Sequence, residues 1–228
     1  MGVHDGHRER LKKRFIDHGL ESFNDVNALE LLLFYAIPRR DTNEIAHNLL
    51  DHFETLSGVF EASVQELQEV DGIGESAAVL LTLIPEVFKK SQISKTNEIT
   101  QIMNSKDAGA YFLPRFMNLR DEYLYMVCLD NKRAVICCRE MAHGVVNSVD
   151  ANVRTIVEAA LKAKAVSVIL AHNHPGGIAI PSREDNYFTK SVFISLDMVG
   201  IKLEDHLIVA GDEFVSYSDS GFMQSIRF

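Results

Sequence analysis

Two histidines, a serine and an aspartate stand close together in the segment 171–185, which reads AHNHPGGIAIPSRED. His172 and His174 are one residue apart, and Ser182 and Asp185 follow in the pattern Ser-x-x-Asp. In an extended segment, residues i and i+2 point to the same side, so both imidazoles can face one point in space. Asp185 can add a carboxylate. Two histidines and one carboxylate leave the fourth position of a tetrahedral zinc ion open for water, which is typical of catalytic zinc sites.

The flanking sequence predicts the elements that would position these side chains. Residues 166–170 (VSVIL) form a short apolar run typical of a buried strand, and both histidines follow it. Pro181 and Ser182 are typical of the beginning of a helix. Asp185 would then lie in the first turn of that helix, near the end of the strand. The apolar stripe of the helix continues at spacings of four, four and three with Phe188, Val192, Leu196 and Val199.

The Ser-x-x-Asp pattern has a second interpretation. Ser182 and Asp185 have the spacing of a capping box, in which an N-cap serine and an acidic residue three positions later satisfy free backbone N–H groups. Two histidines in a turn are also common by themselves. The two interpretations are compatible, because Ser182 could cap the helix and still face a metal ion.

Together these residues resemble the JAMM motif of MPN (JAB) domain metalloproteases. The longer pattern LAHNHPGG…PSRED…T is similar to that of RadC-like proteins, a bacterial branch often labelled as DNA repair proteins. The resemblance covers most of the chain. Its N-terminal part consists of GHRERLKKRF, LELLLFYAIPRRDTNEIAHNLL and the DGIG turn, and its C-terminal part consists of YMVCLDNKRAVI, the HNHP segment and LEDHLIV.

The resemblance implies a zinc ion bound by His172, His174 and Asp185. It also implies that Ser182 donates a hydrogen bond to an oxyanion. Zinc lowers the pKa of a bound water towards neutrality and polarises a substrate carbonyl. A nearby carboxylate would accept the water proton and pass it to the leaving amine. We therefore predict a zinc-dependent metallohydrolase that cleaves peptide or isopeptide bonds in a protein or peptide substrate.

The resemblance also requires an upstream glutamate that activates the water. We favour Glu122, which opens the segment 123–129 where RadC-like chains usually carry an acid. Glu140, expected after the next strand and near a glycine-containing turn, is the second candidate. Glu158, in a predicted helix, is the third. The ordinary role of any one of them is that of a solvated surface carboxylate.

Two positions depart from the family pattern. Gly176 stands where family members usually have a serine after HNHP. Val153, Arg154 and Thr155 stand where they usually have Pro-Arg-Glu. None of the proposed ligands is lost, so these departures affect substrate contacts more than metal binding.

At 228 residues the chain can hold two domains. We predict a small all-α domain over residues 1–92, a polar linker over 93–104, and an MPN/JAB-like metal-binding domain over 105–228. Helices are expected in the first domain at 42–53 and 63–69. In the last domain we expect strands at 123–129, 134–138, 166–170 and about 207–210, and helices at 155–164 and after Ser182. This pattern predicts an α/β (α+β) fold with a mixed sheet flanked by helices.

The first domain contains a helix-hairpin-helix-like segment at about residues 67–90. Glycines in such a turn let backbone N–H groups approach a phosphate, so one alternative function is that of a DNA-associated repair protein. Residues 1–95 carry 10 Lys and Arg against 16 Asp and Glu, a net charge of −6, and the whole chain carries −9. Because phosphate binding is largely electrostatic, this charge favours a packing role for the glycines. The basic cluster at residues 8–14 could contact nucleic acid or an acidic partner, or belong to a solvated first helix.

A second alternative is a non-catalytic interaction module that a metal ion stabilises. An open coordination position adds little to stability, so the two histidines and the aspartate favour catalysis. Asp205 and His206 could orient a metal ligand from behind, or form a strand-edge pair that only satisfies itself. His143 and Asn147, in the turn after Glu140, could border the cleft.

The remaining sequence features indicate the setting of the protein. No apolar run approaches the roughly 20 residues of a membrane span, and the polar N-terminus lacks the apolar region of a signal peptide. The three cysteines, Cys128, Cys137 and Cys138, form no CxxC pair. An odd number of cysteines without an export signal favours reduced thiols and a cytoplasmic location. Cysteine ligands are therefore not expected, and Cys137 and Cys138 should point to opposite sides of a strand.

Overall fold

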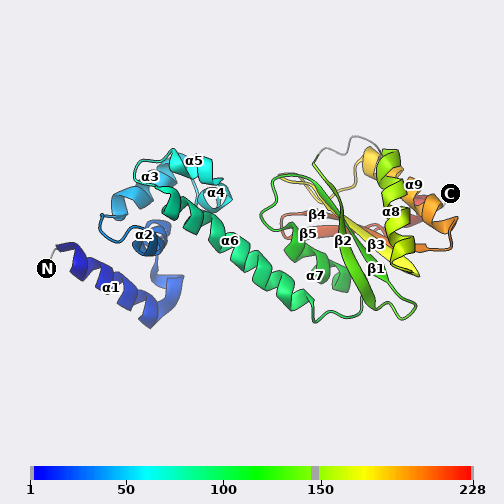
Figure 1. Ribbon diagram of the computed structural model, residues 1–228, viewed down its shortest axis with the longest axis horizontal. Coiled ribbons are helices and arrows are strands. Elements are labelled where there is room, and N and C mark those ends of the chain that lie inside the picture. The colour runs from blue at the N-terminus through cyan, green and yellow to red at the C-terminus, as the bar shows by residue number, and fades with distance from the viewer. Residues whose placement is uncertain (1–2, 145–148, 227–228) are drawn as a thin grey trace. The chain divides into compact units, whose positions relative to one another are not determined.

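The computed structural model describes residues 3–144 and 149–226 of the chain. The chain divides into two compact units, Met1–Phe88 and Lys89–Phe228. The first unit is all-helical, and the second contains a five-stranded mixed sheet flanked by helices (Figure 1). This arrangement confirms the predicted fold class. Among the described helices, none combines the length and the apolar character needed to cross a lipid bilayer.

Short polar caps begin several helices of the first unit. Asn24 caps α2, Thr55 caps α4, and Ser63 caps α5 in the expected capping box with Glu66. Local sequence therefore fixes where these helices begin. The elements of this unit are α1 (Val3–His18), the 3-10 turn η1 (Gly19–Ser22), α2 (Asp25–Ala36), α3 (Asn43–Phe53), α4 (Leu56–Glu61), α5 (Val64–Gln68) and the first part of α6 (Glu75–Thr96).

The turn between α5 and α6 is the helix-hairpin-helix-like segment. Gly72 in this turn has a φ of +93°, a conformation that favours glycine. A Cβ atom at Gly72 would lie 2.8 Å from side-chain carbons of Ile45, which belongs to α3 and is buried in the core of this unit. The packing of the turn against α3 thus requires a glycine at this position.

Helix α6 continues to Thr96, through Pro85 and into the predicted linker. Residues 93–96 are therefore helical. Their Ser, Lys and Ile side chains are compatible with a helix even though they show no sustained apolar period. Beyond Thr96, the next helix begins at Ser105.

The second unit is built on the strand order β2-β1-β3-β4-β5. β1 runs antiparallel to both of its neighbours, β3 and β4 are parallel, and β5 is antiparallel to β4. Helix α9 connects the parallel pair, as a crossover must. The strands are β1 (Tyr123–Leu129), β2 (Val135–His143), β3 (Ser167–Asn173), β4 (Lys202–Ala210) and β5 (Glu213–Ser216), and the helices are α7 (Ser105–Phe116), α8 (Val149–Lys162), α9 (Arg183–Asp197) and α10 (Phe222–Ile226).

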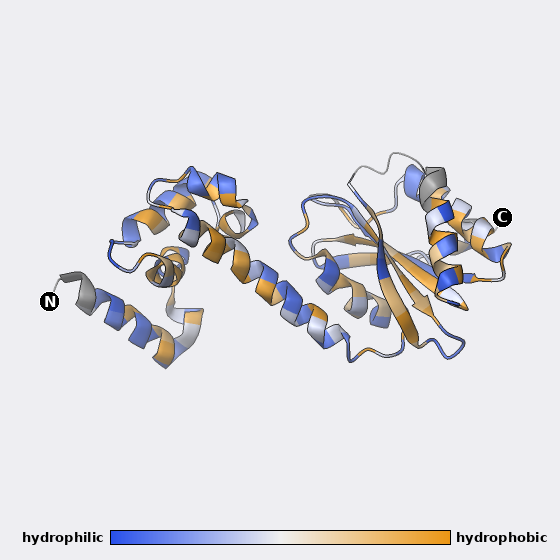
Figure 2. Cartoon of the chain, in the orientation of Figure 1, coloured by the Kyte–Doolittle hydropathy of each residue, from blue (hydrophilic) through white to orange (hydrophobic). Residues whose placement is uncertain are grey.

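Helices cover both faces of the sheet, and Figure 2 shows the strands as strongly hydrophobic. Val168 and Leu170 of β3 pack with α8 and α9 on one face. Ile169 and Ala171 pack with α7 on the other. Because successive residues in a strand point to opposite faces, the same alternation places His172 on the α8/α9 face.

Candidate metal centre

The two histidines lie at the carboxyl end of β3. His172 is the next-to-last residue of the strand, and His174 follows directly after it. The backbone N–H of His174 donates to the carbonyl of Val209 at 2.8 Å, which extends the pairing with β4. The chain therefore stays extended through both histidines, and their Nε2 atoms lie 2.9 Å apart.

Asp185 reaches the histidines from the first turn of α9. Ser182 is the N-cap of this helix, and the capping box is complete. The N–H of Ser182 donates to Asp185 Oδ2 at 2.7 Å, and the N–H of Asp185 donates to Ser182 Oγ at 3.0 Å. This cap holds the carboxylate with Oδ1 3.0 Å from His172 Nε2 and Oδ2 3.3 Å from His174 Nε2.

These three side chains fit a tetrahedral zinc ion. Bonds of about 2.0–2.2 Å at tetrahedral angles separate neighbouring ligand atoms by roughly 3.3–3.5 Å. The observed separations of 2.9, 3.0 and 3.3 Å reach this value or fall a few tenths of an ångström short of it. Their side chains are 12–20% exposed, so the cluster is largely buried but still accessible to solvent. Within the described ranges, His172, His174 and Asp185 are the one group of three His, Cys, Asp or Glu residues spaced to hold a metal ion.

The protonation of the cluster also suits a cation. Burial by itself raises the pKa of Asp185, but the hydrogen bond and charge of His172 and the hydrogen bonds from Ser182 outweigh burial. The pKa of this carboxyl is thereby held well below its usual range, so the group is ionised at neutral pH, as a metal ligand must be.

His206, on β4, lies directly behind His172. It is fully buried, and its Nε2 is 2.9 Å from Nδ1 of His172. Burial, followed by the charge of His172, lowers the pKa of His206 well below its usual value. On its other side, Nδ1 of His206 is 2.7 Å from Oγ1 of the buried Thr189 in α9. His206 thus occupies the orienting position that the sequence suggested for it.

Asp205 does not share this position. Its carboxylate accepts hydrogen bonds from Ser216 Oγ at 2.5 Å and from the N–H of Ser218 at 2.9 Å. Neighbouring residues in a strand point to opposite faces, so the side chains of Asp205 and His206 lie on opposite faces of the sheet. Asp205 contacts His206 through the backbone, because the N–H of His206 donates to Asp205 Oδ1 at 2.8 Å, and the orienting position behind His172 is occupied by the side chain of His206 without the Asp205 carboxylate.

Glu122 immediately precedes β1. It stands two residues before Leu124, which packs on the α8/α9 face and whose Cα partner in β3 is His172. Because side chains alternate along a strand, Glu122 lies on the same face as Leu124. If the antiparallel register of β1 with β3 is continued by two residues, Glu122 stands opposite His174. Its side chain is exposed.

Asn173, the residue between the two histidines, holds the segment that carries Glu122. Its Oδ1 accepts from the N–H of Tyr123 at 2.7 Å, and its Nδ2 donates to the carbonyl of Asp121 at 3.0 Å. The peptide units on both sides of Glu122 are therefore fixed to β3. Sequence reasoning assigned no role to Asn173, although its place between two candidate ligands means that it must point to the other face.

Glu140 lies inside β2 rather than after it, so its predicted position is wrong. It pairs with Tyr125, which packs with the core on the α7 face, and directly paired residues share a face. Glu140 is thus directed away from His172. β2 is an edge strand with mixed exposure, so the sequence shows no clean alternation, and the predicted strand ended too early, at residue 138.

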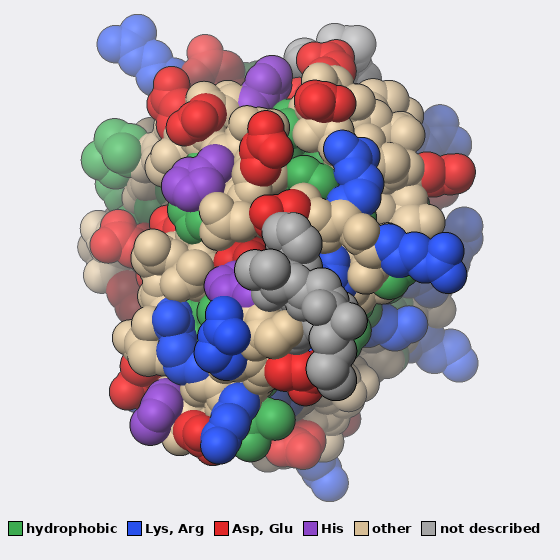
Figure 3. All heavy atoms as spheres, turned by 90° about the vertical axis from the view of Figure 1, so that its left-hand side faces the viewer, with side chains coloured by type: hydrophobic (Ala, Val, Ile, Leu, Met, Phe, Trp, Pro, Cys, Tyr) green, Lys and Arg blue, Asp and Glu red, His purple; other side chains and the backbone are tan. Residues whose placement is uncertain are grey.

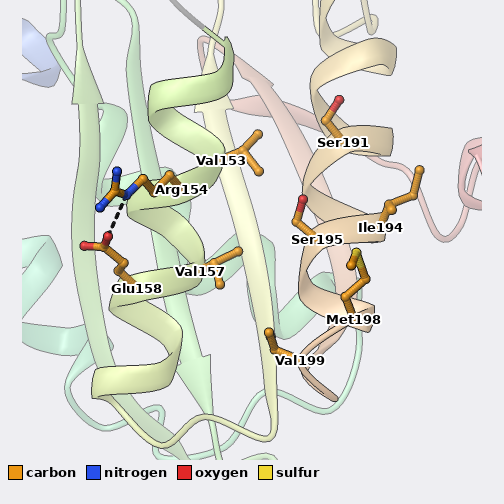
Figure 4. A pocket seen from close by; sticks show the side chains of 9 residues that line it. All are labelled: Val153, Arg154, Val157, Glu158, Ser191, Ile194, Ser195, Met198 and Val199. Atoms are coloured by element: carbon orange, nitrogen blue, oxygen red, sulfur yellow. Dashed lines mark hydrogen bonds and ion pairs between the residues drawn. The ribbon is translucent and has the colours of Figure 1, made fainter.

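Glu158 lies on the surface of α8. It is hydrogen bonded to Arg154 at 2.8 Å at the rim of a hollow between α8 and α9 (Figure 4). The hydrogen bond and charge of Arg154 lower the pKa of Glu158. This glutamate is therefore engaged in an ion pair on the helix surface.

The remaining candidates lie around the cluster. His143 ends β2 and stacks on Tyr123, with ring centroids 4.2 Å apart, so it borders the segment that carries Glu122. Asn147 lies outside the described residues. Cys137 packs on the α8/α9 face and Cys138 on the α7 face, as expected for neighbours in a strand.

The mixed sheet, its flanking helices and the histidine–aspartate cluster define a JAB-type domain. The RadC-like JAB domain model matches residues 102–222, and the UPF0758 N-terminal model matches residues 6–79. The chain therefore belongs to the RadC-like UPF0758 family, which confirms the resemblance seen in the sequence.

Curated relatives extend this match over nearly the whole chain. A UPF0758 protein of Fusobacterium nucleatum is 32% identical over 225 residues, which cover 96% of this chain and 97% of the relative. A UPF0758 protein of Ruegeria pomeroyi is 33% identical over 218 residues (95% and 97%), and one of Bordetella petrii is 33% identical over 215 residues (94% and 96%). These names state the family and no reaction.

Proposed function

We propose that this protein is a zinc-dependent metallohydrolase that cleaves peptide or isopeptide bonds. The observation that carries the proposal is the convergence of two imidazoles and a carboxylate: His172 Nε2 and His174 Nε2 lie 2.9 Å apart, and Asp185 lies 3.0 Å from the first through Oδ1 and 3.3 Å from the second through Oδ2. Zinc bound there would lower the pKa of a water molecule and polarise the substrate carbonyl. The fourth coordination position, which no protein group would need to fill, favours chemistry over a purely structural ion.

Glu122 is the proposed general base. Glu122 lies opposite His174, at the carboxyl end of β3. From this position it would accept a proton from the attacking water and deliver that proton to the leaving nitrogen. Asn173 would keep this carboxylate aligned by holding the backbone on both sides of it.

Ser182 is the proposed donor to the oxyanion. Its hydroxyl donates to Asp185 Oδ2 at 2.7 Å. The N–H of Ser182 also binds that oxygen, so the hydroxyl can rotate towards a substrate oxygen while the carboxylate stays in place. One such donor typically contributes a factor of about 10²–10³ in kcat.

The test is to purify wild type, Glu122→Gln, Glu140→Gln and Glu158→Gln without chelators and to assay each on peptides and isopeptide-linked peptides. We expect about one zinc per chain in all four and a loss of roughly 10²–10⁴ in rate for Glu122→Gln alone. The other two variants are matched controls, because Glu140 faces α7 and Glu158 is paired with Arg154. Equal activity of Glu122→Gln and wild type would refute the assigned base. A wild type that holds zinc but cleaves nothing would favour the interaction module.

A further inference from the structure

We infer that Thr189, acting through His206, is a positioning residue that holds His172 in the tautomer able to bind a metal ion through Nε2. The inference rests on the proposed metal binding and not on turnover. Three groups from three elements form the relay: the hydroxyl of Thr189 in α9, the imidazole of His206 in β4 and the imidazole of His172 in β3.

The direction of the relay is set at Thr189. Its hydroxyl has one hydrogen, which it donates to the backbone carbonyl of Asp185 at 2.5 Å. A carbonyl oxygen can only accept, so the hydroxyl has no second hydrogen to offer. Towards His206 Nδ1, 2.7 Å away, Thr189 must therefore accept, and Nδ1 of His206 carries the hydrogen.

The tautomer of His172 follows from that of His206. A neutral imidazole carries one N–H, so Nε2 of His206 has a lone pair and no hydrogen. His206 is fully buried, and burial favours the neutral ring. Nδ1 of His172 faces that lone pair at 2.9 Å and must donate to it. The lone pair available for a metal ion is then on Nε2 of His172, the atom that points at His174 and Asp185.

Both ends of the relay lie at residues of the histidine–aspartate cluster. It begins at the backbone of Asp185 and ends at His172, so two candidate ligands are tied together from behind. Thr189 is fully buried on a helix face that otherwise buries Val192 and Leu196. An apolar residue would satisfy the packing there, so the hydroxyl is explained by the hydrogen bonds that it makes.

The test compares Thr189→Val with Thr189→Ser in the full-length protein. Valine keeps the shape and removes the hydroxyl, whereas serine keeps the hydroxyl and removes a methyl group. Zinc affinity is measured by competition with a chromophoric chelator, and the histidine tautomers by nitrogen NMR of the imidazole rings. We expect Thr189→Val to weaken zinc binding about 10-fold or more and to change the imidazole signals of His206 and His172, and Thr189→Ser to stay within about threefold of wild type.

A purely structural role for Thr189 predicts the opposite order, because serine would leave a cavity and valine would not. Wild-type zinc affinity and unchanged tautomers in Thr189→Val would overturn the inference, as would a loss in Thr189→Ser equal to or greater than that in Thr189→Val.

A second pair of variants keeps the test decisive if Thr189→Val fails to fold. His206→Gln retains an acceptor towards His172, and His206→Leu does not, so only the leucine variant should lose zinc affinity by 10-fold or more. Equal losses in both would overturn the relay. A wild type that binds no zinc would overturn the metal proposal and the relay together. Zinc binding without hydrolysis, with valine and serine separated as described, would support the relay and remove only the reaction.

Discussion

The helical unit and the sheet unit differ in what some of their buried polar side chains surround. Among the described residues, the helical unit buries Glu30 and Thr42. Both carboxylate oxygens of Glu30 have partners within the fold. Oε1 lies 2.8 Å from His7 Nε2, and Oε2 accepts from Asn43 Nδ2 at 3.2 Å. The sheet unit also buries groups that are paired in this way, such as Asp205 with Ser216, but its buried Asn173, Thr189 and His206 lie around one cluster instead.

This difference shows how a buried polar group can be interpreted. A carboxylate whose oxygens are both used inside the fold, like that of Glu30, ties helices together and leaves no atom for a ligand. The ligand-facing atoms of His172, His174 and Asp185 meet one another, and the other atoms of these side chains are held from behind. Polar groups that converge and are supported in this way are typical of functional sites.

The largest effect is expected when the histidine–aspartate cluster of the sheet unit is disrupted. We expect His174→Ala to reduce bound zinc from about one per chain to none, because it removes one of the three proposed ligands. Free zinc at a thousand times its Kd would stabilise wild type by about 4 kcal/mol. Removal of that zinc by a chelator should therefore lower the free energy of unfolding of the sheet unit by the same amount and leave that of the helical unit unchanged. Metal analysis and thermal unfolding followed by unit-specific hydrogen exchange measure both effects. Zinc that remains in His174→Ala would place the metal elsewhere.

A smaller effect is expected from Gly72→Val in the helical unit. The new side chain would meet Ile45 and strain a backbone with a φ of +93°, so stability should fall by about 2–3 kcal/mol with zinc content unchanged. Gly74→Ala is the matched control, because a Cβ there meets nothing within 4 Å and should cost less than about 1 kcal/mol. Urea unfolding of the zinc-loaded proteins measures both. Equal destabilisation by the two variants would argue against the packing role of Gly72.

The smallest effect is expected for DNA. Arg8 donates to the carbonyls of Ile37 and Arg40, and Arg14 donates to the carbonyl of Ser22, so part of the basic cluster is used in the fold. Figure 3 shows Lys and Arg side chains interspersed with Asp and Glu side chains on one face. We expect no duplex binding tighter than about 100 µM at low salt in a fluorescence anisotropy titration. Micromolar binding that weakens steeply with salt would restore the DNA-associated alternative.

Local spacing in the sequence was enough to predict that His172, His174 and Asp185 lie together and that a cap holds Asp185. The i, i+2 relation aligns His172 with His174 wherever the chain is extended, and the capping box fixes Asp185 at the beginning of a helix. The same kind of local signal located the cap at Ser63. These interactions span only a few residues, so no knowledge of the rest of the fold is needed to foresee them.

Tertiary structure alone decided which distant groups face that cluster. The faces of Glu122 and Glu140 depend on the register of β1 with β2 and β3, and on how far the edge strand β2 continues. The contacts of Thr189 with His206 and of His206 with the candidate ligand His172 join α9, β4 and β3, segments whose meeting no local period specifies. Because strand pairing and helix packing are set by the whole hydrophobic core, the side chains that support a site from behind become visible only when the chain is folded.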